Sequence, residues 1–335
     1  MDYTMNKVQF NKTSLSTTRL GLGLAALGRP GYINLGHAAD LDHEYDPAAM
    51  ESHAHAVLDV AWEHGIRYFD AARSYGRAEE FLASWLKSRN FRPEDVVVGS
   101  KWGYTYTAEW RIDAEKHEVK DLTLPVFRRQ IAESRALLDP YLRLYQIHSA
   151  TLESGVLDDR ALLDSLAELR DTGMVIGLSL SGPGQSDTLR KAMSIRIGGS
   201  PLFGSVQGTW NLLAQEATGA LQEAHDSGMG VIVKEALANG RLTSRNDTPT
   251  FAEKRLVLER LAAEKGTTID ALALAAVLAQ SWADIILSGA AQARHLESNL
   301  KALDVEWDNE MDKQLPLFAE PAEEYWRARS RMNWN

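Results

Sequence analysis

Four side chains suited to proton transfer stand near the ends of apolar runs along the chain. Asp70, Lys101 and His148 each end one such run, and Tyr75 follows Asp70 by five residues. A free phenol has a pKa of about 10, which is too high for efficient acid or base catalysis at neutral pH. A neighbouring ammonium lowers that pKa, a carboxylate keeps a lysine charged, and a histidine can hydrogen-bond a carbonyl oxygen. These residue types predict a carbonyl-polarising site in which Tyr75 donates the proton. Its oxygen is expected within hydrogen-bond reach of Lys101 or His148, about 2.6–3.2 Å or through one water.

Each of the four residues also has an ordinary structural explanation. An aspartate after a strand commonly caps a helix, a lone buried histidine is usually a satisfied core residue, and a tyrosine often only packs its ring. A lysine at a strand end is often solvated. Four such residues at the same end of consecutive strands are harder to explain in this way, so a shared site is the favoured interpretation.

The elements that must position these residues follow a regular alternation of short apolar runs and amphipathic helical patterns. Strands are expected at 20–27, 66–70, 95–101, 142–149, 174–180, 205–211, 230–236 and 285–290. Helices are expected near 49–64, 78–89, 125–139, 159–172, 185–194, 215–227, 268–280 and 293–303. No Pro/Gly/Ser-rich linker divides them, so the sequence predicts an α/β fold, a single (β/α)₈ TIM-barrel domain over 1–335. The carboxyl ends of barrel strands open onto one face, which would gather distant residues around one cavity.

A doubly wound open sheet is the alternative fold. It usually carries a glycine-rich first turn, but Gly21, Gly23 and Gly28 follow G-x-G-x-x-x-x-G spacing rather than G-x-G-x-x-G. The segment 29–47 is expected to form a long first loop, a feature that is more often functional than idle on a barrel. Residues 304–335 are expected to add a C-terminal helix and a tail.

Composition narrows the classes of function. The 335 residues carry 46 acids and 36 bases, a formal charge of −10, which argues against a nucleic-acid partner. Cysteine is absent, so disulfides and thiolate chemistry are excluded. No apolar stretch approaches 18 residues, so no membrane span is expected. The polar first residues do not resemble a signal peptide, and a cytoplasmic location is expected by default.

Two groups of histidines suggest metal ligands at first sight. His53 and His55 are two residues apart on an expected helix and therefore face different sides. His37 and His43 lie in the long first loop, where no cysteine accompanies them. We predict no metal site.

The segment GIRYFDAARSYG, residues 65–76, resembles the G-x-x-x-[FL]-D-[TS]-A-x-x-Y-G signature of the aldo-keto reductase superfamily, with Ala71 in place of the small hydroxyl residue. Lys101 in VVGSKWG and His148 in LYQIHS match that family's lysine and histidine. The segments GMVIGLS, VQGTWNLL, GVIVKEALANGRL and SGAAQARHLESNL agree in order and spacing, so the resemblance covers roughly residues 8–305. It implies a catalytic tetrad of Asp70, Tyr75, Lys101 and His148.

The resemblance further implies an NAD(P)(H)-dependent oxidoreductase that interconverts an aldehyde, ketone or sugar lactol with an alcohol or lactone. NADP(H) is the favoured cofactor and NAD(H) is possible. The implied cofactor-binding residues are Gly23, Leu24, Asp70, Ser179, Gln207, Trp210, Lys234, Ala236, Leu237, Arg241, Gly289, Ala290, Arg294 and Asn299.

The chain departs from the family pattern at several of these positions. Leu180 replaces the asparagine that usually follows the strand-five serine, and Lys234 stands where an aromatic residue usually stacks on the nicotinamide. Ala290 and Ala291 lack the cations that usually recognise the extra phosphate of NADP, which leaves Arg294 and His295, with Arg245 as a further candidate.

The substrate is expected to be a small carbonyl or alcohol compound, for example a sugar or an aromatic aldehyde. Aromatic side chains from several loops would line its pocket: Tyr32, Trp102, Tyr104 and Trp110, with Trp326 or Trp334 of the tail closing it. Two other functions stay open. One is a barrel aldolase, in which Lys101 would form a Schiff base with the substrate. The other is a regulatory subunit that binds cofactor mainly to control a partner. The sequence gives no oligomeric state.

Overall fold

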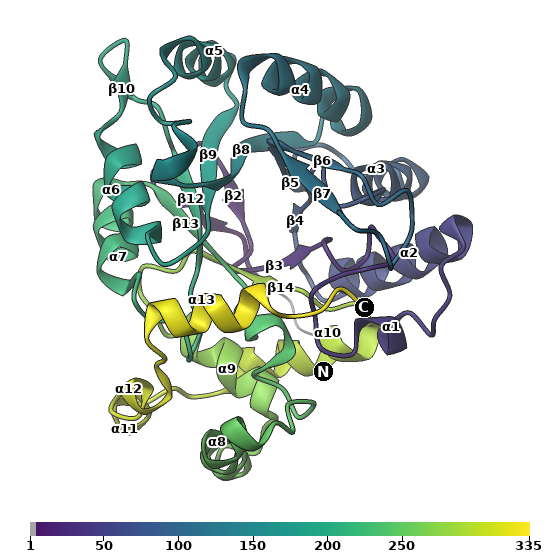
Figure 1. The fold of residues 1–335 in the computed structure, drawn as a ribbon, viewed down its shortest axis with the longest axis vertical. Coiled ribbons are helices and arrows are strands. Elements are labelled where there is room, and N and C mark those ends of the chain that lie inside the picture. Colours follow the sequence, from purple (N-terminus) through teal and green to yellow (C-terminus); the bar gives the residue numbers. More distant parts are fainter. Residues whose placement is uncertain (1–4) are drawn as a thin grey trace.

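The eight apolar runs form the strands of a closed parallel barrel in a computed structural model, which describes residues 5–335. Neighbouring strands follow chain order around the barrel, and β14 closes it against β3 (Figure 1). This confirms the predicted (β/α)₈ fold. The barrel strands are β3 (Leu20–Gly23), β4 (Tyr68–Asp70), β5 (Val97–Trp102), β8 (Leu142–Ala150), β9 (Val175–Leu180), β12 (Ser205–Thr209), β13 (Gly230–Lys234) and β14 (Ile285–Ser288).

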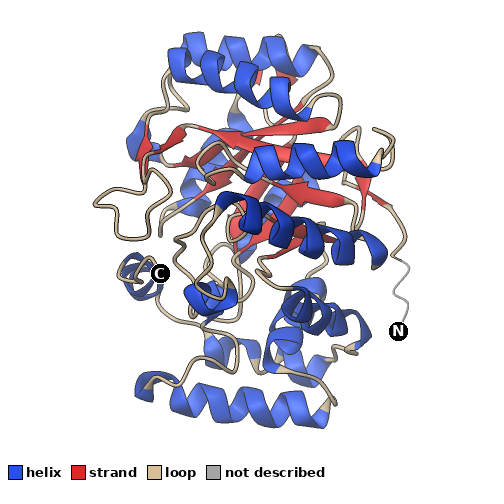
Figure 2. Ribbon diagram, turned by 90° about the vertical axis from the view of Figure 1, so that its right-hand side faces the viewer, coloured by secondary structure: helices blue, strands red, loops and turns tan. Residues whose placement is uncertain are grey.

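Helices surround the strands on the outside (Figure 2). Each expected helix is present, with ends that differ by a few residues: α2 (Pro47–Glu63), α3 (Ala78–Arg89), α4 (Leu124–Leu138), α5 (Arg160–Asp171), α6 (Gln185–Ser194), α7 (Thr218–Ser227), α9 (Ile269–Leu278) and α10 (Ala293–Leu300). Local chemistry fixes some of these ends. Asp46 accepts hydrogen bonds from the amides of Ala48 and Ala49, and Pro47 occupies the first turn, so α2 starts two residues before the expected position.

Several further elements were not expected from the sequence. The longest is α8 (Ala252–Glu264), whose apolar residues are too scattered to mark one face. The short strands form three hairpins: β1 (Val8–Gln9) with β2 (Ser16–Thr17), β6 (Tyr104–Tyr106) with β7 (Glu118–Lys120), and β10 (Arg196–Ile197) with β11 (Ser200–Pro201). The other unexpected helices are α1 (His37–Asp40), α11 (Asn309–Asp312), α12 (Leu315–Phe318) and the 3₁₀ turns η1 (Leu152–Ser154), η2 (Ala238–Gly240), η3 (Pro249–Phe251) and η4 (Lys301–Asp304). The C-terminal helix that the sequence predicted within 304–335 is present as α13 (Ala322–Ser330).

The β1–β2 hairpin closes the amino-terminal end of the barrel. Phe10 and Leu15 of this segment pack in one buried cluster with the inward residues Tyr68 and Leu144. Gly230 leaves room for this arrangement, because a Cβ at that position would lie 2.4 Å from the Phe10 ring. A functional site is therefore expected at the opposite end of the barrel, where the strands finish.

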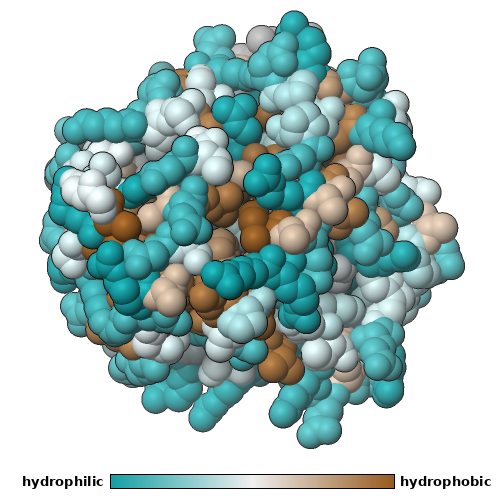
Figure 3. Space-filling model, turned by 90° about the horizontal axis from the view of Figure 1, so that it is seen from above, coloured by the Kyte–Doolittle hydropathy of each residue, from teal (hydrophilic) through white to brown (hydrophobic). Residues whose placement is uncertain are grey.

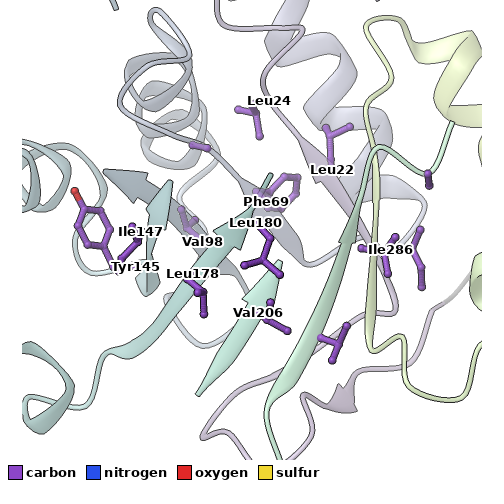
Figure 4. Packing of buried hydrophobic residues seen from close by; sticks show 14 of the residues in the cluster. Leu22, Leu24, Phe69, Val98, Tyr145, Ile147, Leu178, Leu180, Val206 and Ile286 are labelled. Carbon is purple, nitrogen blue, oxygen red and sulfur yellow. The ribbon is translucent and has the colours of Figure 1, made fainter. Parts of the chain in front are cut away.

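Side chains alternate between the inside of the barrel and the surrounding helices, as the pleat of each strand requires. Outward residues such as Phe69, Val98 and Leu178 form the main apolar core with the helices (Figure 4). The inward positions of the same strands carry Tyr68, Asp70 and, further along, Lys101. This alternation decides which strand-end residues can reach a central site.

The C-terminal segment crosses the carboxyl end of the barrel, with α13 in front of the strands (Figure 1). Its last residue, Asn335, pairs with the first loop, where backbone hydrogen bonds of 3.1 and 3.2 Å join it to Tyr32. The face in Figure 3 is mostly hydrophilic, with apolar residues visible between polar ones. Within residues 5–335, no helix is both long and apolar enough to cross a membrane.

Candidate active site

A cavity of about 760 Å³ opens at the carboxyl end of the barrel. Asp70, Tyr75 and His148 line it, and Lys101 is fully buried against Asp70. Three separate strands and one loop therefore bring the four predicted residues together, although they span almost 80 positions of the sequence.

Asp70 is the centre of a buried polar network. Lys101 forms an ion pair with one carboxylate oxygen of Asp70 and also donates to the carbonyl of Ala71 at 3.0 Å. The other carboxylate oxygen accepts from the Gln207 amide at 2.9 Å and from the Tyr68 hydroxyl at 3.2 Å. Several donors on one carboxylate fix its orientation and hold the Lys101 ammonium in place inside the barrel.

Tyr75 is fixed by a tight turn after β4. Its amide donates to Ala72 at 3.0 Å, and the next residue, Gly76, has a φ of 59°. A Cβ at Gly76 would lie 2.3 Å from the carbonyl oxygen of Gly28, so the turn packs directly on the first loop. The sequence motif ending in Tyr-Gly is thus required by backbone contact as well as by chemistry.

The ring of Tyr75 lies between the other groups of the site. Its centroid is 5.0 Å from the Lys101 nitrogen and 5.5 Å from the His148 ring, which it meets edge-on. Among residues 5–335 no direct hydrogen bond joins the Tyr75 hydroxyl to Lys101 or His148, so of the two expected contacts the direct one is absent. The hydroxyl is therefore available to a ligand, and such bonds often tighten only when substrate binds.

The charge states of Tyr75 and His148 follow from burial. Burial raises the pKa of Tyr75 above its ordinary value, and the Asp70 carboxylate raises it further. The net shift is opposite to the lowering expected from the sequence, because burial and Asp70 together outweigh the nearby positive charge of Arg29. Burial, followed by the charge of Lys101, lowers the pKa of His148 well below its usual range. Both side chains are therefore neutral at neutral pH, which makes each a hydrogen-bond donor to a carbonyl oxygen.

Most of the residues expected to bind cofactor line the same cavity. They come from the ends of β3, β4, β12, β13 and β14 and from the segments that follow β13 and β14: Gly23, Asp70, Gln207, Lys234, Ala236, Leu237, Gly289, Ala290 and Asn299.

Five expected cofactor residues do not line the cavity. Leu24 is buried in the core, and Ser179 lies beneath the cavity, where its hydroxyl accepts from the Ser149 amide at 2.8 Å. Trp210 points outward and donates to Thr218 at 2.8 Å.

The other two are arginines from the segments after β13 and β14. Arg241 pairs with Glu320 of the C-terminal segment, at 2.5 Å between Nη2 and Oε1, and lines a separate groove. Arg294 is exposed on α10, on the solvent side of the helix.

The expected substrate residues divide in the same way. Tyr32 and Tyr104 line the cavity, together with Trp334 of the tail. Trp102 immediately follows Lys101, so strand alternation turns it outward, and it packs on Phe127 at 5.1 Å between ring centroids.

Two other indole side chains also lie outside the cavity. Trp110 donates its indole N–H to the carbonyl of Tyr45 at 2.6 Å and packs against Phe81. Trp326 lies buried on α13 and is not a cavity residue.

Sequence reasoning missed several charged residues of the cavity. Arg29 from the first loop is buried and pairs with Glu118 of β7 at 2.9 Å. Glu235, one residue after β13, pairs with Arg329 of α13, whose Nε lies 3.0 and 2.9 Å from the two carboxylate oxygens. No periodic pattern marks these residues, since they come from loops and from a helix far along the chain.

The cavity wall also carries buried polar atoms that a ligand could satisfy. Asn239 and Thr267 line the cavity, and the side-chain oxygen of each is buried without a hydrogen-bond partner among residues 5–335. Such atoms can be satisfied by ligand hydroxyl groups. In the described part of the chain no group of three or more histidines or acids is placed to hold a metal ion.

Comparisons with known proteins identify the family. The family model "Aldo/keto reductase family" matches residues 19–316. Pyridoxal reductase from Arabidopsis thaliana is 25% identical over 332 residues, covering 90% of this chain and 83% of that protein. D-threo-aldose 1-dehydrogenase from a Pseudomonas species is 26% identical over 249 residues, covering 69% and 71%.

A solved structure supports the fold. The holo form of an aldo-keto reductase from Bacillus halodurans aligns with a TM-score of 0.70 at 21% identity, over 96% of this chain and 99% of that one. Barrel topology, the convergence of the four residues and the family match lead to one conclusion: the chain belongs to the aldo/keto reductase family.

Proposed function

We propose that the protein is an NAD(P)(H)-dependent oxidoreductase that interconverts a carbonyl compound and its alcohol, with Tyr75 as the general acid and base. The observation that carries the proposal is the convergence of Asp70, Tyr75, Lys101 and His148 at one end of a large cavity. A bound nicotinamide cofactor would supply or accept the hydride, while the protein positions the substrate and polarises its carbonyl.

In the direction of reduction, the carbonyl oxygen receives its proton from the Tyr75 hydroxyl. Burial keeps this phenol protonated before the reaction. The neutral His148 donates a hydrogen bond to the same oxygen and so orients it. Lys101, held by Asp70 5.0 Å from the Tyr75 ring centroid, stabilises the phenolate that remains. In oxidation the phenolate takes the proton back from the alcohol.

We expect NAD(H) to bind better than NADP(H), in contrast to the preference expected from the sequence. Arg294, expected to pair with the extra phosphate, is exposed and outside the cavity. Arg245 does line the cavity, but its guanidinium pairs with the buried carboxylate of Asp40, 2.7 Å from Nη1 to Oδ2. Burial lowers the pKa of the nearby His295, so that side chain adds little positive charge.

A coupled absorbance assay tests the proposal. Neutral aromatic aldehydes, pyridoxal and aldoses would be offered with each nucleotide in both directions, because curated relatives are named for pyridoxal and for aldoses. Tyr75→Phe removes the proton donor and keeps the ring, so kcat should fall about 10²–10⁴-fold while nucleotide Kd changes little. Near-normal turnover by this variant would refute the mechanism. Tight nucleotide binding by the unaltered protein without turnover of any compound would favour a regulatory subunit instead.

A further inference from the structure

Carboxylates at the Tyr75 end of the cavity are each matched by a cation. The three pairs are Asp70 with Lys101, Glu118 with Arg29, and Glu235 with Arg329. One further cation, Lys234 at the end of β13, also lines this end. Within residues 5–335, the cavity end around Tyr75 therefore carries one positive charge more than its carboxylates balance.

Lys234 lacks a carboxylate at hydrogen-bond distance. Its ammonium donates to the hydroxyl of Thr209 at 2.7 Å, a neutral partner. The nearest oxygen of Glu235 is 3.7 Å away, beyond hydrogen-bond range, and Arg329 already binds both oxygens of that carboxylate. Glu235 therefore gives Lys234 only a longer ion pair, and a largely buried ammonium is costly without an anionic partner at hydrogen-bond distance. Burial lowers the pKa of Lys234 to about 8, and the ammonium still predominates at neutral pH.

The position of Lys234 connects it to the reacting end of the cavity. Thr209 and Lys234 end adjacent barrel strands, where they pair in register. The charge of Lys234 is among those that lower the pKa of His148. An anion bound by this ammonium would thus share the space around Tyr75 and His148, away from Asp40 and Arg245 at the other end.

We propose that Lys234 binds an anionic group, a carboxylate or a phosphate, carried by the carbonyl substrate. This inference rests on the proposed function and makes it more specific: the substrates are carbonyl compounds with an acidic group. Such a group would complete the coordination of the ammonium and balance the extra positive charge. A neutral aldehyde of the same size would leave the ammonium without an anionic ligand and the extra positive charge unbalanced. The acidic aldehyde should therefore have the higher kcat/KM.

The test compares matched aldehydes that differ in one charge. Meta- and para-carboxybenzaldehyde are measured against the corresponding methylbenzaldehydes in the unaltered protein, Lys234→Met and Lys234→Arg. The ratio of kcat/KM for acidic over neutral aldehyde should be about tenfold or more in the unaltered protein and fall to about one in Lys234→Met. Lys234→Arg keeps the charge and should retain most of the ratio. A general loss of activity lowers kcat/KM for both aldehydes and therefore cancels in their ratio.

A control and a binding measurement separate the possible outcomes. Lys120→Met removes a cation near the same opening, one that donates to the Ser149 carbonyl at 2.7 Å and does not line the cavity, so it should leave the ratio unchanged. Binding of isophthalate, followed by tryptophan fluorescence, should weaken in Lys234→Met alone. A ratio near one in the unaltered protein, or one that Lys234→Met does not lower, overturns the inference.

Lys234→Met could instead weaken the binding of NADH and NADPH and leave the acidic-over-neutral ratio unchanged. That result would assign Lys234 to a cofactor phosphate and would also overturn the inference. If no aldehyde is turned over, the proposed function itself fails, and fluorescence with isophthalate still reports on Lys234.

Discussion

The ion pair between Glu235 and Arg329 makes a quantitative prediction about the C-terminal helix. Arg329 lies on α13, and its guanidinium binds both carboxylate oxygens of Glu235 beside β13. Glu235→Gln would keep the shape of the side chain and remove its charge, leaving a largely buried guanidinium unpaired. The substitution should therefore loosen α13 from the barrel.

The expected magnitude follows from the pKa of Glu235. Burial opposes ionisation of this carboxyl, but the charge of Arg329, with a smaller contribution from Lys234, prevails and lowers the pKa from 4.5 to about 2. That difference corresponds to about 3 kcal/mol of stability, since a tenfold change in proton affinity is worth about 1.4 kcal/mol. The unpaired Arg329 adds to the loss, giving about 3–5 kcal/mol. For a chain of 335 residues this lowers Tm by about 4–7 °C.

Thermal unfolding at a series of pH values is the assay. A carboxyl whose pKa is lowered on folding stabilises the protein fully above pH 4.5, and the contribution is lost as the pH falls toward 2. The difference between the unaltered protein and Glu235→Gln should thus be constant from pH 7 to about 5.5 and shrink below about 4.5. Trypsin should also cut the variant faster at the arginines of α13.

A solvent-exposed ion pair of the same two residue types provides a matched control. Glu223 also binds an arginine through two oxygens, with 2.9 Å to both Nε and Nη2 of Arg190, but both side chains are about half exposed. Glu223→Gln should therefore change Tm very little. Equal shifts in the two variants, or a deficit in Glu235→Gln that persists unchanged at pH 3.5, would refute the reasoning that burial gives the Glu235 pair its strength.

Three further predictions concern the cavity and the core. Lys101→Met should lower kcat about as much as Tyr75→Phe, about 10²–10⁴-fold, and the double variant should be no worse than the single ones in single-turnover assays, because both disable one proton transfer. Asp40→Asn should free Arg245 and improve NADPH binding relative to NADH by about tenfold in fluorescence titrations; an unchanged Kd ratio would show that Arg245 does not face the phosphate. Trp102→Ala should destabilise the protein by about 3–5 kcal/mol in urea unfolding, with little change in aldehyde KM, since the indole is buried on Phe127.

The barrel could be predicted because its signals are local. Each apolar run is long enough to show in the sequence, and the polar residue that ends it, such as Asp70 or His148, marks the carboxyl end of its strand. Trp102 and Trp210 lie outside the cavity, although their aromatic character favours a place in a binding site. Counting alternate positions from Lys101 or Gln207 would have turned both of them outward.

The rest of the site could not be found in this way. Arg329 reaches the cavity from a helix 94 residues beyond Glu235, and Arg29 reaches Glu118 from the first loop. Such pairs depend on tertiary packing, for which a single sequence carries no periodic signal. The raised pKa of Tyr75 was missed for a related reason. It depends on burial and on the nearby Asp70 carboxylate, and both are properties of the folded chain.

Alternation of side chains along the barrel strands also limits how the chain can change in length. Deleting one residue before Lys101 within β5 would carry the Trp102 indole into the barrel and turn the lysine toward α4. The same deletion in the loop 29–47 would only shorten a surface segment. Insertions and deletions tolerated by this protein should therefore be confined to its loops and hairpins, while each strand keeps its number of residues even where the residues themselves are exchanged.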